Sequence, residues 1–345
     1  MPPLLSICIG TYNRAGFLAE TLDSIVQQIR DDVEVIIVDG ASPDNTIEVV
    51  TPYLKEYPQI RYYRELTNSG VDGDYDKAVS YAAGDYCWLM PDDDLLMHDA
   101  IFRVLQSLDE SSPDLVVVNS ECWNADFSIN LHTNMLNIKS DREYAVENND
   151  LALIELASCL SYIGSVVIKR SKWLERDRIS YYGSLFVHVG VIYQHPPLKL
   201  IKALTQPVIK IRYGNAMWTP RSFEIWYFKW PKLIWSFVDF TDELKSKVVP
   251  LKPWRSSLKL FKSRAKGEYS HSEFRKFLSA EPLSISIAIA WAVSIFPAKV
   301  ANFLGVIYYS LRMKSSLYAL FDLLRSRHAS RFSRLVARFF GVRVL

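Results

Sequence analysis

The first third of the chain alternates short apolar runs with segments whose apolar residues recur at helical spacing. The apolar runs predict strands at residues 4–9, 33–38, 60–63, 86–90 and 115–118. Helical patterns lie between them, over residues 17–29, 45–54, 75–83 and 99–108. Strands and helices in this order form a mostly parallel sheet with helices on both faces. The sequence therefore predicts an α/β fold for this part of the chain.

Three polar clusters directly follow the ends of predicted strands, at residues 11–14, 39–45 and 91–94. In mostly parallel sheets, ligands bind beyond the carboxyl ends of the strands. We therefore expect the three clusters to line one crevice.

The composition of the chain changes near residue 216. Two further strands are expected before this point, at residues 164–169 and 198–211. After it, tryptophans crowd a helical-looking stretch, at Trp218, Trp226, Trp230, Trp235 and Trp254. We expect an α/β domain over residues 1–215 and a helical region over residues 216–345.

Charge and motif content exclude several classes of protein. The 345 residues include 40 Lys or Arg and 38 Asp or Glu, a net charge of +2 that argues against a general nucleic-acid binder. The chain has no GxGxxG or GxxxxGK[ST] motif, so neither a dinucleotide enzyme nor a P-loop NTPase is supported. Four widely spaced cysteines and the lack of a signal-peptide pattern indicate reduced thiols in the cytoplasm.

The acidic triplet Asp92, Asp93 and Asp94 follows the apolar run 86–90 with only Pro91 between them. Three adjacent carboxylates repel one another unless a cation lies among them, and Mg2+ and Mn2+ prefer oxygen ligands. A solvated turn that caps the next helix is an equally ordinary interpretation. Asp39, at the end of the second predicted strand, can accept hydrogen bonds from a ligand or can stabilise an Asx turn.

Taken together, the motifs are more specific than each is alone. They run in order as SICIGTYNR from Ser6, VIIVDGASPDNT from Val35, NSG from Asn68, AGDY from Ala83, and the aspartates 92–94. The chain resembles the family-two glycosyltransferases, which have a Rossmann-like GT-A fold. Residues 68–94 resemble the abequosyltransferase-type branch, which acts in O-antigen assembly.

The resemblance implies a role for each matching position. Four residues would lie near the nucleotide of the donor: Thr11, Tyr12, Asn13 and Arg14. Asp39 would read a pyrimidine base, Asn68 would bind the donor, and Asp72 would lie near the base or ribose. Asp92 and Asp93 would contact the donor, and Asp92 and Asp94 would hold Mg2+ or Mn2+, with Asp93 as the next candidate ligand. Gly10 departs from the proline that the family usually has before Thr-Tyr-Asn.

The implied reaction is one displacement at the anomeric carbon, which inverts its configuration. A base must deprotonate the acceptor hydroxyl. Many relatives have a Glu-Asp pair where this chain has Val187 and His188, so His188 is the candidate base, although a histidine between apolar residues is usually structural. Asp74, Asp76 and Glu224 are weaker candidates. A chain without a base would instead be a non-catalytic nucleotide-sugar-binding or scaffold protein of a polysaccharide assembly complex.

The composition of the last third of the chain predicts association with a membrane surface. Residues 283–311 are largely apolar but are broken by Pro297 and Lys299, and a buried helical pair is the alternative. Residues 312–345 hold eight Lys or Arg and one acid, a net charge of +7, so residues 1–311 carry −5. Arginines beside apolar helices attract anionic lipids. We expect a peripheral protein at the inner face of the cell membrane, with a lipid-linked or cell-surface glycan as acceptor.

The tryptophans Trp218, Trp226 and Trp230 could stack on a sugar. Their spacing of eight and four residues also suits the buried face of a helix. Aromatic stripes at helical spacing are mostly core, so we expect core packing.

Overall fold

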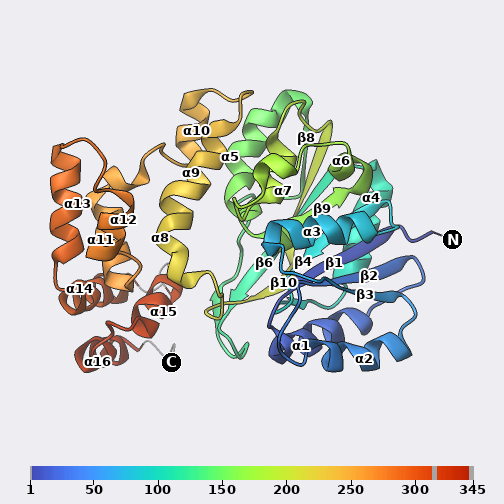
Figure 1. The fold of residues 1–345 in the computed structure, drawn as a ribbon, viewed down its shortest axis with the longest axis horizontal. Helices are drawn as coiled ribbons and strands as arrows, with labels where there is room; N and C mark the ends of the chain where they lie inside the picture. The colour runs from blue at the N-terminus through green and yellow to red at the C-terminus, as the bar shows by residue number, and fades with distance from the viewer. Residues whose placement is uncertain (1, 313–316, 342–345) are drawn as a thin grey trace. The chain divides into compact units, whose positions relative to one another are not determined.

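The computed structural model describes residues 2–312 and 317–341. These residues form two compact units, coloured along the chain in Figure 1. The first unit is Met1–Trp123, Thr133–Arg212 and Ser236–Val248, and the second is Asn124–His132, Tyr213–Trp235 and Val249–Leu345. Lys314 and Arg343 of the basic tail lie outside the described residues.

The first unit is built on one mixed, mostly parallel sheet. Its strands are β1 (Leu5–Thr11), β2 (Val33–Asp39), β3 (Ile60–Arg64), β4 (Tyr86–Met90), β5 (Leu95–Leu96), β6 (Leu115–Trp123), β9 (Val166–Lys169) and β10 (Leu200–Arg212). They lie in the order β3-β2-β1-β4-β9-β6-β10-β5. Strands β3, β2, β1 and β4 are parallel, and β6 is parallel to β10. Strand β9 is antiparallel to both of its neighbours, and β8 (Arg142–Ala145) is antiparallel to β10. The predicted α/β fold is confirmed.

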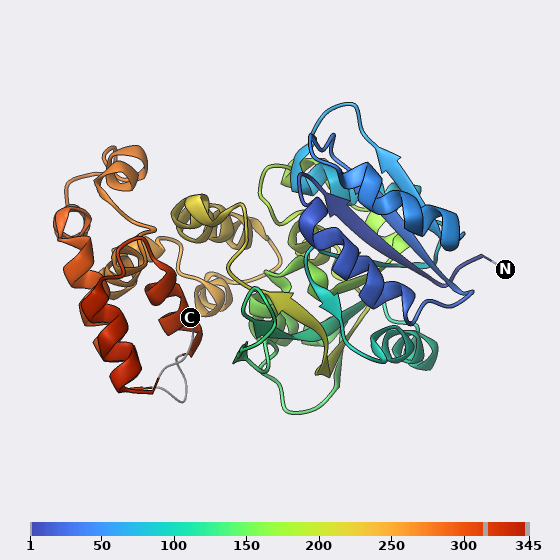
Figure 2. The ribbon, with the colours of Figure 1, turned by 90° about the horizontal axis from the view of Figure 1, so that it is seen from below.

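The apolar sequences of the central strands are explained by helices that cover both faces of the sheet. Strands β2 and β4 are buried along their whole length, because helices cover the sheet on both faces. Helices α1 (Ala15–Val26) and α2 (Thr46–Glu56) lie on one face and α3 (Gly70–Tyr81) lies on the other (Figures 1 and 2). In α1, Leu18, Leu22 and Ile25 are fully buried at helical spacing.

Helix α3 begins at Gly70, five residues before the start that the apolar pattern predicts. The pattern misses the first turns because their inward-facing side chains are Asp72, Asp74 and Asp76, all of which are buried. A helix whose buried side carries polar residues shows no apolar repeat in the sequence, so this pattern cannot predict its first turns.

The first unit contains further α-helices. They are α4 (Ala100–Ser111), α5 (Asn149–Leu160), α6 (Arg170–Leu174), α7 (Val187–Tyr193) and α10 (Asp242–Val248). Helix α10 lies against α5, so residues 236–248, beyond the expected boundary at 215, belong with the first unit.

The second unit is mainly helical. Its helices are α8 (Ser222–Glu224), α9 (Trp230–Ser236), α11 (Ser257–Lys266), α12 (His271–Phe277), α13 (Ile285–Ile295), α14 (Ala298–Ser310), α15 (Leu317–Arg325) and α16 (Arg331–Phe339), and it also contains the short strand β7 (Asn130–His132). Trp230 is buried and Trp226 packs against the aromatic core of the unit, whereas Trp218 is 43% exposed.

No single helix among residues 2–312 and 317–341 is long and apolar enough to cross a bilayer. Only together are helices α13 and α14 long and apolar enough to cross a bilayer. The pair is bent by 97° at the break between the two helices.

Candidate functional site

The candidate site lies where three parallel strands end. Thr11 is the last residue of β1 and is paired in register with Asp39, the last residue of β2. Asp92 follows the neighbouring strand β4 by two residues, and the Thr11 hydroxyl donates a 2.7 Å hydrogen bond to its Oδ2. The fold thus brings together at one sheet edge side chains that are 81 positions apart.

The Arg14 guanidinium pairs with two of the three carboxylates of the acidic motif. Its Nη2 forms an ion pair with Asp93, and its Nε lies 3.6 Å from Asp92 Oδ1. The guanidinium also lies 4.5 Å from the centre of the Phe17 ring, on the first turn of α1. A cation therefore already lies between the two carboxylates.

Asp94 points away from this cation and into the protein. Its carboxylate accepts hydrogen bonds from the Tyr162 hydroxyl at 2.5 Å and from the Arg212 backbone N–H at 2.6 Å. It is 2% exposed, and burial together with the charge of Asp93 raises its pKa well above the usual range. Burial, followed by the charge of Asp93, also raises the pKa of Asp92 to about 7.

Asp39 is fully buried beneath the turn that follows β2. Its carboxylate accepts hydrogen bonds from the Ser42 N–H at 2.7 Å and from the Tyr62 hydroxyl. The Ser42 hydroxyl in turn accepts the Asn13 N–H at 2.9 Å, which joins the turns after β1 and β2. Asn13 and Ala41 have φ angles of 56° and 64°, left-handed values of the kind that concentrate at functional turns.

The N-terminal half of α3 packs tightly on these two turns. A Cβ on Gly40 would lie 2.9 Å from Asp74 Oδ2, and a Cβ on Gly10 would lie 3.3 Å from Asp74 Cβ. Asp74 accepts a 2.6 Å hydrogen bond from Ser69, and burial raises its pKa. Gly10, which replaces the usual proline, therefore leaves room for α3.

Two other residues that the resemblance implicates are more accessible. Tyr12 is half-buried and Asn68 is exposed. Asn68 Oδ1 accepts the Gly70 N–H at 2.7 Å, so this side chain also helps to start α3.

Asp72 is directed toward a loop rather than toward solvent. Its carboxylate accepts the backbone N–H groups of Gly183, Leu185 and Val187 at 2.8, 2.9 and 3.0 Å. Leu185 has a φ of 71°, an unusual backbone conformation for a bulky residue. Asp72 therefore holds the strained loop that leads into α7.

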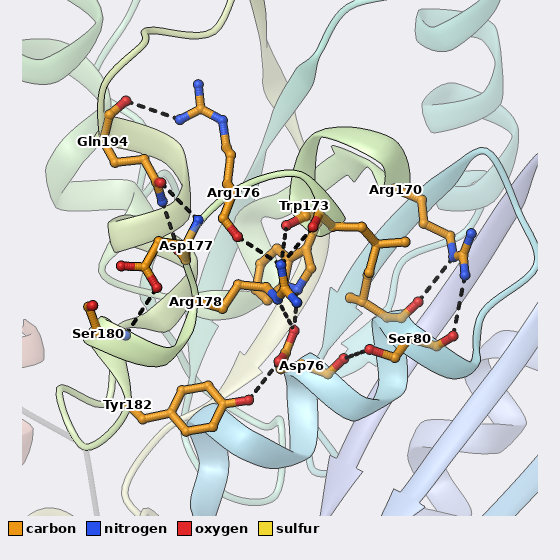
Figure 3. Close-up of polar contacts among 12 residues, drawn as sticks. Asp76, Ser80, Arg170, Trp173, Arg176, Asp177, Arg178, Ser180, Tyr182 and Gln194 are labelled. Carbon is orange, nitrogen blue, oxygen red and sulfur yellow. Dashed lines mark hydrogen bonds and ion pairs between the residues drawn. The ribbon is translucent and has the colours of Figure 1, made fainter.

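Asp76, one turn further along α3, binds the preceding segment of the same loop (Figure 3). Its carboxylate accepts hydrogen bonds from Trp173 Nε1 at 2.8 Å and the Tyr182 hydroxyl at 2.6 Å, and it forms a 2.7 Å ion pair with Arg178. Arg170 donates to backbone carbonyls at the end of α3. Both carboxylate oxygens of Asp76 therefore already have partners within the protein.

His188 lies in the interior, in the first turn of α7. Its side chain is 1% exposed, its Nε2 lies 2.8 Å from the Leu160 carbonyl, and its Nδ1 has no hydrogen-bond partner among the described residues. Burial lowers the pKa of His188 to about 4. The imidazole does not reach solvent in this conformation. Glu224, a weaker candidate base, belongs to the second unit and pairs with Arg221 at 3.0 Å.

Comparisons with known proteins agree with this geometry. The family described as Glycosyl transferase family 2 matches residues 6–168. The abequosyltransferase RfbV of Salmonella typhimurium is 32% identical over 225 residues, which cover 61% of this chain and 67% of that protein. The chain belongs to glycosyl transferase family 2. It is a glycosyltransferase.

Two solved structures show that this family-2 member has the GT-A fold. S. aureus TarS 1–349 in complex with UDP aligns with a TM-score of 0.55 and 13% identity, over 93% of this chain and 90% of that one. The mannosyltransferase PcManGT of Pyrobaculum calidifontis, in complex with GDP-Man and Mn2+, aligns with a TM-score of 0.52 and 15% identity, over 99% and 89%.

A divalent ion fits only part of the acidic motif of this glycosyltransferase. Among the described residues, no group of three or more His, Cys, Asp or Glu side chains is arranged to hold a metal. Asp94 is bound to Tyr162 and Arg212, so its oxygens are turned away from a ligand. Asp92 and Asp93 present carboxylate oxygens, but toward Arg14.

Four of the residues that shape this site were not identified from the sequence: Ser42, Tyr62, Tyr162 and Arg212. Ser42 lies within the polar cluster 39–45 that follows the second predicted strand, so the sequence indicated the turn but not the role of this residue. The others reach the site from β3, from the segment before β9, and from the end of β10. No local pattern marks a residue whose role depends on strands that are distant in sequence.

Proposed function

We propose that this protein transfers a sugar, of the dideoxyhexose type, from a nucleotide donor to a lipid-linked or cell-surface glycan, with inversion at the anomeric carbon. The observation that carries the proposal is the convergence of Thr11, Asp39 and Asp92 at the ends of β1, β2 and β4. The similarity to an abequosyltransferase supports this type of sugar and acceptor.

The donor nucleotide is proposed to bind over the turns after β1 and β2. Thr11, Tyr12, Asn13 and Arg14 line the first of these turns. Asp39 would read a pyrimidine base, because each carboxylate oxygen can accept a second hydrogen bond. It is fully buried in the present structure, so this role requires the turn after β2 to open. The two similar structures hold UDP and GDP-Man, which supports a nucleotide-sugar donor, and the choice of a pyrimidine is tested below.

Asn68 and Asp72 would serve the base or ribose side of the donor. Asn68 is exposed and can contact a ligand directly. Asp72 would act through the loop at residues 183–187, since it accepts three of the backbone N–H groups there.

Mg2+ or Mn2+ is proposed to be held by Asp92 and Asp93 rather than by Asp92 and Asp94. The reason is that Asp94 is 2% exposed and is bound by Tyr162 and Arg212. A bound divalent ion would supply positive charge against a departing diphosphate. Arg14 would then be freed from its present ion pairs to bind phosphate oxygens.

The base that deprotonates the acceptor hydroxyl is proposed to be His188, in a conformation that exposes its ring. A general base must lie within hydrogen-bond reach of the proton that it removes. The ring is buried against Leu160 in the present structure, so this role requires movement of α7 or of the loop before it.

The protein is proposed to work as a peripheral protein at the inner face of the cell membrane, where a lipid-linked acceptor would lie. The net charge of +7 on residues 312–345 supports this location, because the cytoplasmic leaflet is anionic.

The proposal is tested in two steps, first by donor binding and then by turnover. A ligand that binds the folded state at about 100 times its Kd stabilises it by about 2.7 kcal/mol, so nucleotide sugars can be screened by thermal shift with and without Mn2+. We expect a pyrimidine nucleotide sugar to raise the melting temperature of the wild type but not of Asp39→Asn. Transfer from that donor to a lipid-linked glycan is then measured. Stabilisation by no nucleotide sugar, or binding without transfer to any such acceptor, would contradict the proposed function.

A further inference from the structure

Helix α16 presents an exposed apolar stripe that no described residue covers. Phe332, Leu335 and Phe339 are 71%, 64% and 85% exposed. They follow one another at spacings of three and four residues, so they lie along one side of the helix. We call these three side chains the α16 stripe.

The inner side of the same helix is fixed by packing within the second unit. Ser333 donates a 2.9 Å hydrogen bond to the buried side chain of Asn302 on α14, and Ala337 is 2% exposed. The Asn302 amide also donates to the carbonyls of Ala265 and Leu323. Ser330 and Ser333 form a capping box at the start of α16. The helix therefore cannot turn the α16 stripe inward without breaking these contacts.

A third side of α16 is basic. Arg331, Arg334 and Arg338 are all exposed, and the helix contains no acidic residue. Among the described residues, no carboxylate lies within 4.0 Å of any of these three guanidinium groups. At 100° per residue, the centre of the arginines lies roughly 100° around the helix from the α16 stripe and roughly 115° from the side that packs on α14.

We propose that α16 binds the surface of an anionic membrane, with the α16 stripe inserted at the level of the lipid head groups and the three arginines paired with lipid phosphates. The inference rests on the proposed function only in that the acceptor is membrane-bound. An apolar side next to a cationic side is what an anionic lipid interface complements. A second copy of the chain fits less well, because antiparallel two-fold pairing through the α16 stripe would place both sets of arginines on the same side of the pair.

Vesicle sedimentation of the whole 345-residue chain tests this surface. Wild type is expected to bind vesicles containing phosphatidylglycerol more tightly than pure phosphatidylcholine vesicles. The variant Phe332→Ser/Leu335→Ser/Phe339→Ser is expected to bind both types at least about tenfold more weakly, because each apolar side chain loses its burial. The variant Arg331→Gln/Arg334→Gln/Arg338→Gln is expected to lose on the order of 100-fold for the anionic vesicles alone, at about 1 kcal/mol per arginine.

The matched control replaces three exposed apolar residues elsewhere, Val238→Ser/Leu251→Ser/Leu258→Ser, which are 82%, 52% and 59% exposed. It should bind vesicles like wild type. All variants should unfold at the wild-type temperature, since each change is on the surface, and all should keep wild-type donor binding.

Three results would overturn the proposal. They are wild-type vesicle binding by both α16 variants, equal wild-type binding to neutral and anionic vesicles, and a stable dimer in the absence of lipid that the stripe variant abolishes. Because donor binding is measured in the same samples, failure of this surface is distinguishable from failure of the proposed enzyme activity.

Discussion

The guanidinium of Arg14 forms an ion pair with the carboxylate of Asp93, although the two residues are 79 positions apart. Both side chains are largely shielded from solvent, at 10% and 14% exposure. The same guanidinium lies 3.6 Å from Asp92. An arginine thus takes the place among the aspartates where a divalent ion is proposed to bind.

Replacement of Arg14 by glutamine should make the protein depend on metal for its stability. Without metal, Arg14→Gln leaves two shielded carboxylates uncompensated and is expected to cost about 2–3 kcal/mol in unfolding free energy. Mn2+ should then raise the melting temperature more in the variant than in wild type. The control is Arg30→Gln, which removes an exposed pair with Asp32 and should cost less than about 1 kcal/mol. An identical response of wild type and Arg14→Gln to Mn2+ would contradict this view of the site.

Asp93 and Asp94 should differ when each is changed to asparagine. Asp93→Asn removes a proposed metal ligand and is expected to weaken Mn2+-dependent donor binding by about tenfold or more, with little effect on folding. Asp94→Asn disturbs a buried acceptor of Tyr162 and Arg212 and is expected to cost about 1–2 kcal/mol of stability while the Mn2+ response persists. Calorimetric titration and urea unfolding measure the two effects. If Asp94→Asn instead lost the Mn2+ response and Asp93→Asn kept it, Asp94 would be the metal ligand.

Asp72 should act as an anchor for the loop before α7. Asp72→Asn replaces one of two acceptor oxygens by a donor that faces backbone N–H groups, so we expect a loss of about 1–3 kcal/mol in urea unfolding. Asp31→Asn is the matched control, since Asp31 is exposed and should tolerate the change. Wild-type stability of Asp72→Asn would show that the loop does not depend on this carboxylate.

His188 should make folding sensitive to acid. Its pKa falls from 6.5 to about 4 in the folded state, because burial disfavours the charged ring. As the pH falls below about 6.5 the unfolded chain takes up a proton that the folded chain refuses, so stability decreases with falling pH and the loss levels off near pH 4. The total is about 3 kcal/mol.

The variant His188→Gln keeps a donor for the Leu160 carbonyl but cannot titrate. The difference in unfolding free energy between wild type and variant should therefore change with pH between about 6.5 and 4. Turnover of the same variant tests the proposed base: a loss of about 100-fold or more is expected if His188 removes the acceptor proton. Near-normal turnover would assign His188 to the core alone.

Gly40 and Gly16 offer a matched pair of alanine substitutions. A methyl group on Gly40 would meet Asp74 Oδ2 at 2.9 Å, so Gly40→Ala should cost about 1–3 kcal/mol and weaken donor binding. Gly16, in α1, has open space around the added methyl, so Gly16→Ala should be neutral or stabilising. Equal melting temperatures for the two variants would show that α3 moves away without cost.

The sequence alone determined the strands β1, β2, β3, β4, β6, β9 and β10, the helices α1 to α4, and the edge of the sheet where the polar clusters lie. Residues such as Leu5, Val35 and Trp88 form apolar runs because parallel strands are covered on both faces, and this is a local signal. The turn residues Thr11 and Asp39 end their strands in the sequence as they do in the fold.

Only the tertiary structure decided what each carboxylate contacts. Asp72, Asp74 and Asp76 alternate along one helix and look equivalent in the sequence, yet they bind the 183–187 loop, Ser69, and the Trp173–Arg178–Tyr182 group respectively. The same holds for Asp93 and Asp94, which are adjacent in the chain but bind Arg14 and Tyr162. The apolar pattern that marks a strand can be read from consecutive residues, whereas a buried charge is stabilised by partners that arrive from distant segments. That physical difference separates what could be predicted here from what had to be observed.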